Sequence, residues 1–265
     1  MSSKITINTG APQGCVLSPL LFTLYTNDCK SSSNSVKLFK FSDDSTLQGL
    51  ITDNDESLYR DEVSKLVSWC NQNNLVLNVS KTKELIIDFR RDPLPLVPLV
   101  IDGQTVELVN SFKFLGTLIS NDLKWEINTT FIIKKCHQRL FFLRKLKKFG
   151  VDKAILIQFY RAVIESVLTF SITTWYGSLN ASDLERVDKI IFTSSKIIGA
   201  SLDSASEIYN KRTAKKVASI RRYRDHPANH LFNCLPSGRR FRSILSKTDR
   251  FKNSFYVRAM RETCP

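Results

Sequence analysis

The 265-residue sequence predicts an α+β protein, in which an antiparallel sheet with helices precedes an all-helical bundle and a basic tail. Three observations support this class. Short β-prone runs bounded by turn residues fill the front half, apolar residues at helical spacing follow, and basic residues gather near the end. The composition, 42% hydrophobic and 24% charged, excludes a collagen, a coiled-coil rod or a fully disordered chain.

The net charge of +14 is concentrated in two segments. Residues 131–150 hold seven Lys and Arg and no acidic residue, and residues 211–265 hold 15 against three. Because no long apolar run accompanies them, we expect these segments to bind nucleic acid and not a membrane. We predict three regions, at 1–127, 128–210 and 211–265.

The six cysteines are widely spaced and form no Cys-x-x-Cys pair. The sequence also has no recognisable secretory leader and no apolar run of about 18 residues. We therefore expect free thiols in an intracellular protein, nuclear or cytoplasmic and not secreted.

The first informative segment is a loop that leads into a helix. Gly10 and Gly14 flank Pro12 and Gln13, and Ser18-Pro19 predicts a helix cap followed by proline at the first helical position. Apolar residues from Leu20 onward predict a buried helix. The glycines allow close approach of a flat ligand, and Gln13 can both donate and accept hydrogen bonds. A plain loop before a helix is the alternative.

The segment 36–49 predicts a β-hairpin with Asp43 and Asp44 at its tip. Neighbouring side chains on extended backbone point to opposite faces, so one of these carboxylates can fully enter a metal site and the other lies beside it. A two-metal site therefore needs a further carboxylate from elsewhere. An ordinary turn is the alternative.

The rest of the front half predicts one helix and several short strands. Residues 53–73 predict a helix with an inward face, residues 85–89 a strand, and Asp102-Gly103 a hairpin turn, before another strand opens at Ser111. The helix's predicted inward residues are Tyr59, Val63, Leu66 and Cys70.

The back half predicts three amphipathic helices between about 129 and 199. A capping box over 182–185 opens the third, which ends at Gly199. The inward residues of the first are Ile133, Cys136, Leu140, Leu143 and Leu146, and those of the second are Leu156, Tyr160, Val163 and Val167. The third presents Leu184, Val187, Ile191, Ser194 and Ile198.

Taken in order, these segments resemble the reverse transcriptases of non-LTR, LINE-type retrotransposons. The loop and helix from Gly10 to Phe22 look like motif B, and Phe41-Ser42-Asp43-Asp44 looks like motif C. Residues 78–83 (Asn-Val-Ser-Lys-Thr-Lys) look like motif D, and 112–116 (Phe-Lys-Phe-Leu-Gly) like the primer grip. The helical region is similar to the thumb, and residues 235–241 and 250–255 are similar to the family's basic C-terminal stretch.

The resemblance implies RNA-directed DNA synthesis on an RNA template and a DNA primer from deoxynucleoside triphosphates, with two Mg²⁺ ions. Asp43 would bind metal, and Asp44 would support it near the primer terminus. Lys81 would protonate the leaving pyrophosphate. The remaining implied residues are Pro12, Gln13 and Gly14 in the nucleotide and template pocket, and Phe114 and Gly116 under the primer.

Two departures from the family pattern matter. Ser42 stands where relatives carry a small apolar residue, and only nine residues precede the motif B loop, without the strand that bears the other metal-binding aspartate. We therefore expect a C-terminal reverse transcriptase fragment that is inactive alone. We also expect an uncovered sheet edge and an uncovered apolar helix face, which favour aggregation.

The segment around 130–200 also resembles the N-terminal domain of an AlkB-type repair homologue. The sequence has neither a His-x-Asp…His iron triad nor a Gly-x-Gly-x-x-Gly nucleotide fingerprint, so we do not expect that chemistry.

Three other functions remain open. The first is a catalytically inert nucleic-acid-binding remnant, whose basic residues interleave with aromatic ones. The second is a zinc module at His226, His230 and Cys234, whose helical spacing is interrupted by Pro227. The third is a working polymerase completed by an aspartate from another chain; the oligomeric state is open. The binding residues of the first are Lys134, Lys135, Arg139, Lys147, Lys148, Arg239, Arg240 and Arg242.

Overall fold

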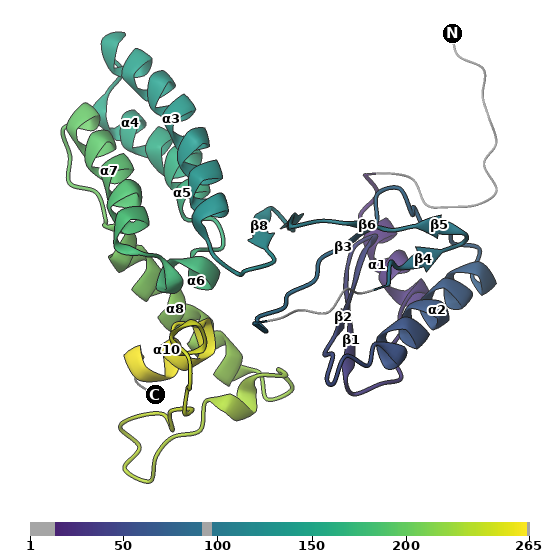
Figure 1. Ribbon diagram of the computed structural model, residues 1–265. Coiled ribbons are helices and arrows are strands. Elements are labelled where there is room, and N and C mark those ends of the chain that lie inside the picture. Colours follow the sequence, from purple (N-terminus) through teal and green to yellow (C-terminus); the bar gives the residue numbers. More distant parts are fainter. Residues whose placement is uncertain (1–13, 92–96, 264–265) are drawn as a thin grey trace, which may run out of the picture. The chain divides into compact units, whose positions relative to one another are not determined.

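The computed structural model describes residues 14–91 and 97–263 (Figure 1). The chain divides into two compact units. Unit 1 comprises Met1–Glu84 and Phe89–Val109, and unit 2 comprises Leu85–Asp88 and Asn110–Pro265. Both helices and strands are present, so the α+β class is confirmed at this level. The division into regions at 1–127, 128–210 and 211–265 stays a prediction.

Unit 1 combines two helices with small paired strands. The elements are α1 (Leu17–Tyr25), β1 (Val36–Phe41), β2 (Asp44–Gly49), α2 (Ser57–Gln72), β3 (Lys83–Glu84), β4 (Val100–Ile101), β5 (Gln104–Thr105) and β6 (Glu107–Leu108). β1 pairs with β2 and β4 with β5, both antiparallel, whereas β3 pairs with β6 in parallel. The predicted turn at Asp102-Gly103 is confirmed, with positive φ at both residues.

Helix α2 presents the predicted inward face to the core of unit 1. Val63 and Cys70 are buried there, and Tyr59 packs against the core cluster. The helix starts at Ser57, later than the predicted 53, because Asp53 and Asn54 adopt positive φ in a tight turn. The core cluster consists of Val63, Val79, Leu99, Ile101 and Val106.

Helix α1 differs from the prediction in two respects. Its N-cap is Val16, which gives no side-chain hydrogen bond, so Pro19 lies at the third helical position and not the first. None of its residues is buried, and Leu20, Leu21 and Leu24 are each more than half exposed. The predicted buried helix is therefore wrong for this chain, because no described element covers its apolar face.

The predicted strand at 85–89 is also wrong. Pairing stops after β3, where Lys83 and Glu84 meet Glu107 and Leu108 of β6. An isolated run of β-prone residues needs a neighbouring strand to complete its hydrogen bonds, and the described residues provide none beyond Glu84.

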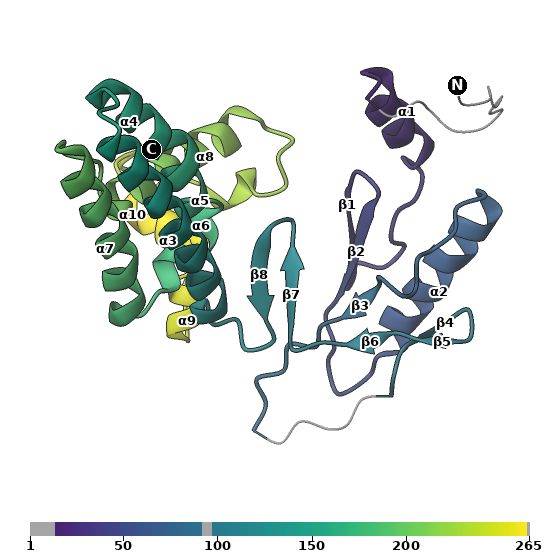
Figure 2. The same ribbon diagram turned by 90° about the horizontal axis from the view of Figure 1, so that it is seen from above.

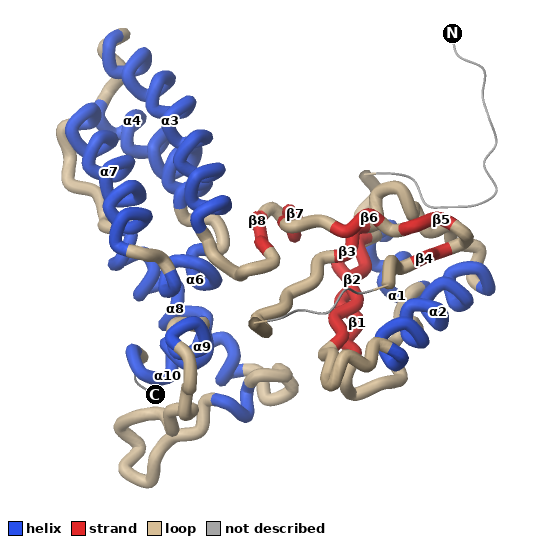
Figure 3. The backbone as a smooth tube through the Cα atoms, in the orientation of Figure 1, coloured by secondary structure: helices blue, strands red, loops and turns tan. Residues whose placement is uncertain are grey.

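Unit 2 is a β-hairpin followed by helices (Figure 2, Figure 3). The hairpin joins β7 (Ser111–Phe114) to β8 (Thr117–Ser120), and two long helices, α3 (Glu126–Lys148) and α7 (Ala181–Ile198), run alongside each other. The remaining elements are α4 (Lys153–Phe159), a π-helix (Tyr160–Glu165), α5 (Ser166–Leu168), α6 (Ile172–Trp175), a 3₁₀ turn (Tyr176–Ser178), α8 (Ala205–Arg222), a 3₁₀ turn (Asn229–Leu231), α9 (Asp249–Lys252) and α10 (Phe255–Glu262).

The π-helix explains why part of the predicted inward face of the second helix is off by one residue. Leu156 and Tyr160 are fully buried as expected, but beyond them Ile164 and Leu168 occupy the core instead of Val163 and Val167. A π-helical turn accommodates an extra residue, so it shifts the inward face by one position along the chain.

The stretch Lys153–Ser178 is, among the described residues, a helical segment long and apolar enough to cross a membrane by length and composition. The prediction that the chain has no such segment is therefore wrong. Leu156, Ile164 and Leu168 within it are fully buried in the core of unit 2. This packing is typical of a core helix, and we interpret the stretch as one.

Capping residues account for two further differences. Asn180, and not Ser182, caps α7, because its side-chain oxygen accepts from the Asp183 N–H; Gly199 ends the helix at φ 75° as predicted. Helix α8 was not predicted, although Ser204 and Glu207 form a complete capping box at its start.

The predicted basic tail is folded. A second core cluster lies between the end of α8 and α10, and it includes Phe232 and Phe241. Its buried members are Val217, Ile220, Ala228, Phe232, Phe241, Ala259 and Met260.

Candidate functional site

The two adjacent aspartates lie at the tip of the β1–β2 hairpin. Phe41 pairs with Asp44, so Ser42 and Asp43 form a two-residue turn, with positive φ at Ser42. Asp43 and Asp44 are both exposed. Within the described part of the chain, neither carboxylate makes a hydrogen bond or an ion pair, so both are available to a cation.

The two faces of this hairpin differ in character. Leu47 packs against the core of unit 1, opposite Leu38 on the partner strand. The alternate positions give the other face, where Phe39 is 48% and Phe41 63% exposed and Asp44 lies directly across from Phe41. The carboxylate therefore sits beside an apolar surface that no described element covers.

The loop before α1 falls largely outside the described residues. Pro12 and Gln13 belong to that part. Gly14 has φ +82°, and no atom of the described residues lies within 4 Å of the position that a Cβ would occupy. That this loop closely approaches a ligand stays a prediction.

Asn78 organises the segment that resembles motif D. Its side-chain oxygen accepts from the Lys81 N–H at 3.1 Å and from the Ser80 hydroxyl at 2.8 Å. This turn leaves the Lys81 side chain exposed, and its ammonium has no ion-pair partner among the described residues. By contrast, the Lys83 ammonium is paired with Glu107 at 2.5 Å, so Lys81 is the freer cation of the two.

The predicted primer-seating residues lie on the β7–β8 hairpin of unit 2, whereas Asp43 belongs to unit 1. Leu115 and Gly116 form the turn of this hairpin, with φ 45° and 92°. A Cβ at Gly116 would lie 3.0 Å from the ring of Phe170, so the turn packs closely on that side chain. Phe114, the last residue of β7, is half-buried.

A lysine from the hairpin and a lysine from α3 share one aromatic ring. The Lys135 ammonium lies 4.2 Å from the centroid of the Phe131 ring, and that of Lys113 lies 5.6 Å from it. A cation over an aromatic face is attracted by the ring quadrupole. The shared ring links the hairpin to α3. A hydrogen bond adds a second link, because the Leu118 N–H of the hairpin donates to the side-chain oxygen of the buried Asn128 of α3 at 3.1 Å.

The outward face of α3 carries most of the predicted basic residues. Lys134, Lys147 and Lys148 are exposed. Arg139 is partly engaged, because its guanidinium donates to the carbonyl of Val163 at 2.5 Å, within the π-helix. The sequence could not reveal this second role, which depends on a carbonyl supplied by another helix.

The three predicted arginines near the C-terminus, Arg239, Arg240 and Arg242, are exposed. In the described part of the chain, none of their guanidinium groups is paired with a carboxylate.

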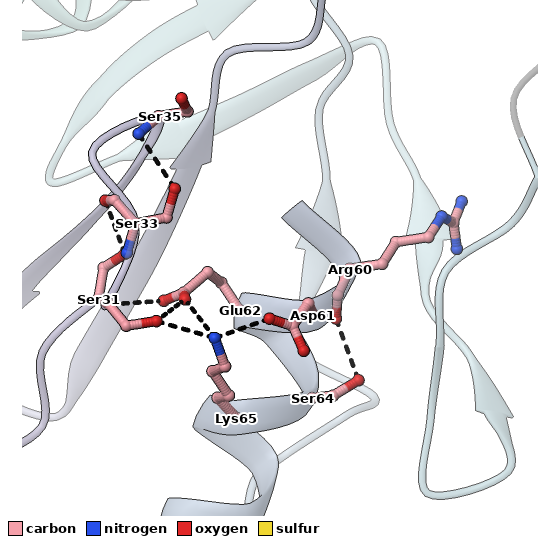
Figure 4. Close-up of polar contacts among 9 residues, drawn as sticks. Ser31, Ser33, Ser35, Arg60, Asp61, Glu62, Ser64 and Lys65 are labelled. Atoms are coloured by element: carbon pink, nitrogen blue, oxygen red, sulfur yellow. Dashed lines mark hydrogen bonds and ion pairs between the residues drawn. The ribbon is translucent and has the colours of Figure 1, made fainter. Parts of the chain in front are cut away.

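One buried carboxylate is a feature that the sequence does not predict. Glu62 of α2 is 4% exposed and accepts from the Ser32 N–H at 3.0 Å, from the Ser32 hydroxyl and from the Lys65 ammonium at 3.0 Å (Figure 4). Burial opposes ionisation, but the hydroxyls of Ser32 and Ser31 and the Lys65 ammonium together lower the Glu62 pKa to about 2. The carboxylate ties the segment before β1 to α2, on the wall of a pocket of about 150 Å³.

The predicted zinc ligands do not share a helix face. Helix α8 ends at Arg222, and the His226 ring nitrogen Nδ1 accepts from the Ala228 N–H at 3.1 Å. Across residues 14–91 and 97–263, no group of three or more His, Cys, Asp or Glu side chains could hold a metal ion. The cysteines in these ranges are free, as expected. The zinc interpretation is therefore wrong for this part of the chain.

Comparisons with known proteins agree with the family that these motifs resemble. Residues 1–119 match the family of reverse transcriptases, described as RNA-dependent DNA polymerases. A Drosophila melanogaster protein described as a probable RNA-directed DNA polymerase from transposon X-element is 24% identical over 200 residues. The match covers 72% of this chain and 22% of that relative, so the chain corresponds to less than a quarter of its length. No solved structure matches the chain.

These matches indicate the class that the front of the chain resembles: it is similar to part of a reverse transcriptase. More particularly, the resemblance to the LINE-type, non-LTR enzymes is confirmed by the transposon relative.

A second family model, for the N-terminal part of the alkylated DNA repair protein alkB homolog 8, matches residues 125–166. This agrees with the resemblance noted in the sequence. The matched segment comprises α3, α4 and the π-helix. Among the described residues, it contributes to no cluster of His, Cys, Asp or Glu that could hold a metal ion.

Proposed function

We propose that unit 1 contributes the carboxylate-bearing hairpin of an RNA-directed DNA polymerase, which extends a DNA primer on an RNA template. The observation that carries the proposal is the position of Asp43 and Asp44: exposed, unpaired and adjacent, at a hairpin tip inside the segment that matches the reverse transcriptase family. Free carboxylate oxygens are the ligands that Mg²⁺ prefers.

In the proposed reaction, the primer 3′-hydroxyl gives up its proton to solvent as its oxygen bonds to the α-phosphorus of a deoxynucleoside triphosphate. The bond from that phosphorus to the bridging oxygen breaks, and pyrophosphate leaves. Two bound Mg²⁺ ions would stabilise the charge that develops on the attacking and leaving oxygens. Asp43 would hold an ion, and Asp44, on the uncovered face beside Phe41, would lie next to the primer end.

The other predicted residues take supporting roles. The unpaired Lys81 ammonium can donate a proton to the departing pyrophosphate, as a flexible cation suits a polyphosphate. Gly14, with open space at its Cα, and the preceding Pro12 and Gln13 would line the nucleotide and template pocket. Phe114 and Gly116 would seat the primer.

Carboxylate oxygens are suitable ligands for Mg²⁺, but the described residues supply too few of them at this position. The described residues supply Asp43 and Asp44 without a third nearby acidic side chain, whereas a two-ion site needs a carboxylate from a different segment. We therefore expect the chain alone to incorporate little nucleotide, and a second polypeptide that supplies the third carboxylate to raise incorporation.

Primer extension on poly-rA/oligo-dT with Mg²⁺ or Mn²⁺ tests the proposal. Incorporation, with or without the second polypeptide, should disappear in Asp43→Ala. It should persist in Asp102→Asn, which changes an aspartate at another hairpin turn and suits the positive φ there. Incorporation that survives Asp43→Ala would refute the role of this carboxylate.

A second candidate function is binding of nucleic acid without catalysis. It is favoured by the exposed, unpaired lysines of α3, which are interspersed with exposed Phe141, Phe142 and Phe149. Affinity for a DNA duplex should then fall with salt, and Lys147→Gln/Lys148→Gln should reduce the log–log slope by up to about 0.9 for each phosphate that is no longer neutralised. An unchanged slope would exclude α3 as the binding surface.

A further inference from the structure

The segment Asn233–Arg242 forms a small hairpin that the proposed polymerase reaction does not use. Cys234 and Phe241 form an isolated antiparallel β-bridge. Two backbone hydrogen bonds flank it: the Leu235 N–H donates to the Arg240 carbonyl, and the Arg242 N–H donates to the Asn233 carbonyl, each at 2.8 Å. The turn closes where the Gly238 N–H donates to the Leu235 carbonyl at 2.8 Å, with φ +68° at Gly238. These bonds give the segment a defined backbone conformation.

Phe241 anchors the hairpin to the C-terminal core. Its side chain is 3% exposed, and its ring meets that of Phe232 edge to face at 5.5 Å between centroids. The Arg221 guanidinium of α8 lies 5.3 Å from the Phe241 ring centroid. An edge-to-face pair with a cation over the ring is a favourable aromatic arrangement, so the ring holds this strand in place.

The residues on either side of the buried Phe241 are exposed. They are Arg240 and Arg242, and Arg239 in the turn is exposed as well. The described residues place no carboxylate in an ion pair with any of the three.

The local charge is strongly positive. Segment 211–265 has three acidic residues, Asp225, Asp249 and Glu262, and Glu262 is bound to Arg258 at 2.6 Å. A guanidinium presents a planar set of N–H donors that matches the geometry of phosphate oxygens. Three such groups lie on one loop whose backbone is already hydrogen-bonded, so the backbone loses little conformational entropy on binding.

We propose that the hairpin Asn233–Arg242 is a preformed phosphate-binding element that contacts the backbone of nucleic acid through Arg239, Arg240 and Arg242, with Phe241 as the positioning residue. The inference deepens the second candidate function and rests on it. Because contacts to phosphate oxygens carry no sequence information, the proposal implies binding that is independent of base sequence.

Binding of the full chain to a short DNA duplex over a range of salt concentrations tests the proposal. Arg239→Gln/Arg240→Gln/Arg242→Gln should lower affinity at least about tenfold at low salt and reduce the log–log salt slope by about 2.7, or about 0.9 for each phosphate released. The matched control, Lys153→Gln/Lys189→Gln/Lys196→Gln, removes the same charge from exposed positions on α4 and α7. It should change both quantities much less.

Phe241→Ala separates geometry from charge, since it keeps every arginine while removing the anchor. Affinity should fall in this variant although the net charge is unchanged, provided that circular dichroism still shows the helices of unit 2. Full affinity in Phe241→Ala, together with weakened binding in the arginine variant, would overturn the preformed geometry. Equal decreases in the arginine variant and the lysine control would overturn the specific role of the hairpin.

Two further outcomes distinguish the hairpin from α3 and nucleic acid from a membrane. If Lys147→Gln/Lys148→Gln weakens duplex binding while the arginine variant does not, the hairpin proposal fails and nucleic-acid binding by α3 stands. If the arginine variant loses binding to phosphatidylserine vesicles but keeps duplex binding, the partner is an anionic membrane and the proposal is wrong.

Discussion

Unit 2 encloses a large core of fully buried side chains, whereas the core of unit 1 is small. In unit 2, Leu140, Tyr160 and Trp175 are fully buried in one continuous core. In unit 1, Leu20 of α1 and Phe41 of β1 are more than half exposed, although Val63 and its neighbours form a small core. Unit 2 also exposes large apolar side chains, such as Phe149 and Phe192, so the two units differ in the size of the core. In unit 1, the apolar face of α1 is a surface that a further partner could cover.

A cavity in the core of unit 2 should be the most damaging change to either unit. Leu140→Ala should lower the free energy of unfolding of unit 2 by about 3–5 kcal/mol, because it removes a fully buried side chain. Val63→Ala should cost unit 1 about 1–2 kcal/mol, since it removes two methyl groups from a smaller core. Urea unfolding followed by the fluorescence of Trp175 and Trp125 for unit 2, and of Trp69 for unit 1, measures both.

A Val63→Ala cost equal to that of Leu140→Ala would mean that the two cores are equally well packed and that the contrast between the units is wrong.

A smaller effect is expected at the buried Glu62 of unit 1. Glu62→Gln should destabilise unit 1 by about 1–3 kcal/mol, because the amide cannot accept from Ser32 and Lys65 as a carboxylate does. The folded pKa of about 2 lies below the ordinary 4.5, so the carboxylate stabilises the fold above about pH 4.5. That stability is lost as pH falls from there toward 2.

Urea midpoints of unit 1 between pH 6 and pH 2.5 test this sign. The parent chain should lose stability on acidification and Glu62→Gln should lose less; parallel curves for the two would contradict the assignment.

The next largest effect on stability is expected at the turn of the β7–β8 hairpin. Gly116→Ala should destabilise unit 2 by about 1–2 kcal/mol, since alanine is strained at φ +92° and its Cβ would lie 3.0 Å from the Phe170 ring. Gly103→Ala is the matched control, with φ +75° but nothing within 4 Å. The difference in thermal midpoint between the two variants, each against the parent, reports the close approach to Phe170; no difference would show that the ring moves aside freely.

Local pattern predicted which helix faces point inward, but not where each helix is capped. The inward residues of α2, α3 and α7 follow from helical spacing, because periodicity depends on a few neighbouring residues. The caps at Val16 and Asn180 and the shift to Ile164 depend on single-residue choices and on packing with other elements. The capping box at Ser204 was visible in the sequence and was missed.

The same limit applies to the candidate site. The turn residues around Asp43 and Asp44 predicted their place at a hairpin tip, because a two-residue turn is a local structure. The engagement of Arg139 with Val163 and of Glu62 with Ser32 could not be predicted, since each joins residues far apart in the sequence. The strand expected at 85–89 failed for a related reason, because a strand needs a partner that local sequence does not specify.

The least change in stability, and the most direct test of the uncovered surface, is expected in α1. Leu20→Gln/Leu24→Gln should change the free energy of unfolding by no more than about 0.5 kcal/mol per site, because both side chains are exposed. The variant should nevertheless bind less of a fluorescent apolar dye and self-associate less, as it breaks up a contiguous apolar face. Leu245→Gln is the control, since Leu245 is 87% exposed and lies outside α1. Sedimentation velocity and dye titration of the two variants decide the point. A large stability loss in the α1 variant would mean that this face is covered in the chain as it stands, and unit 1 would then be as self-contained as unit 2.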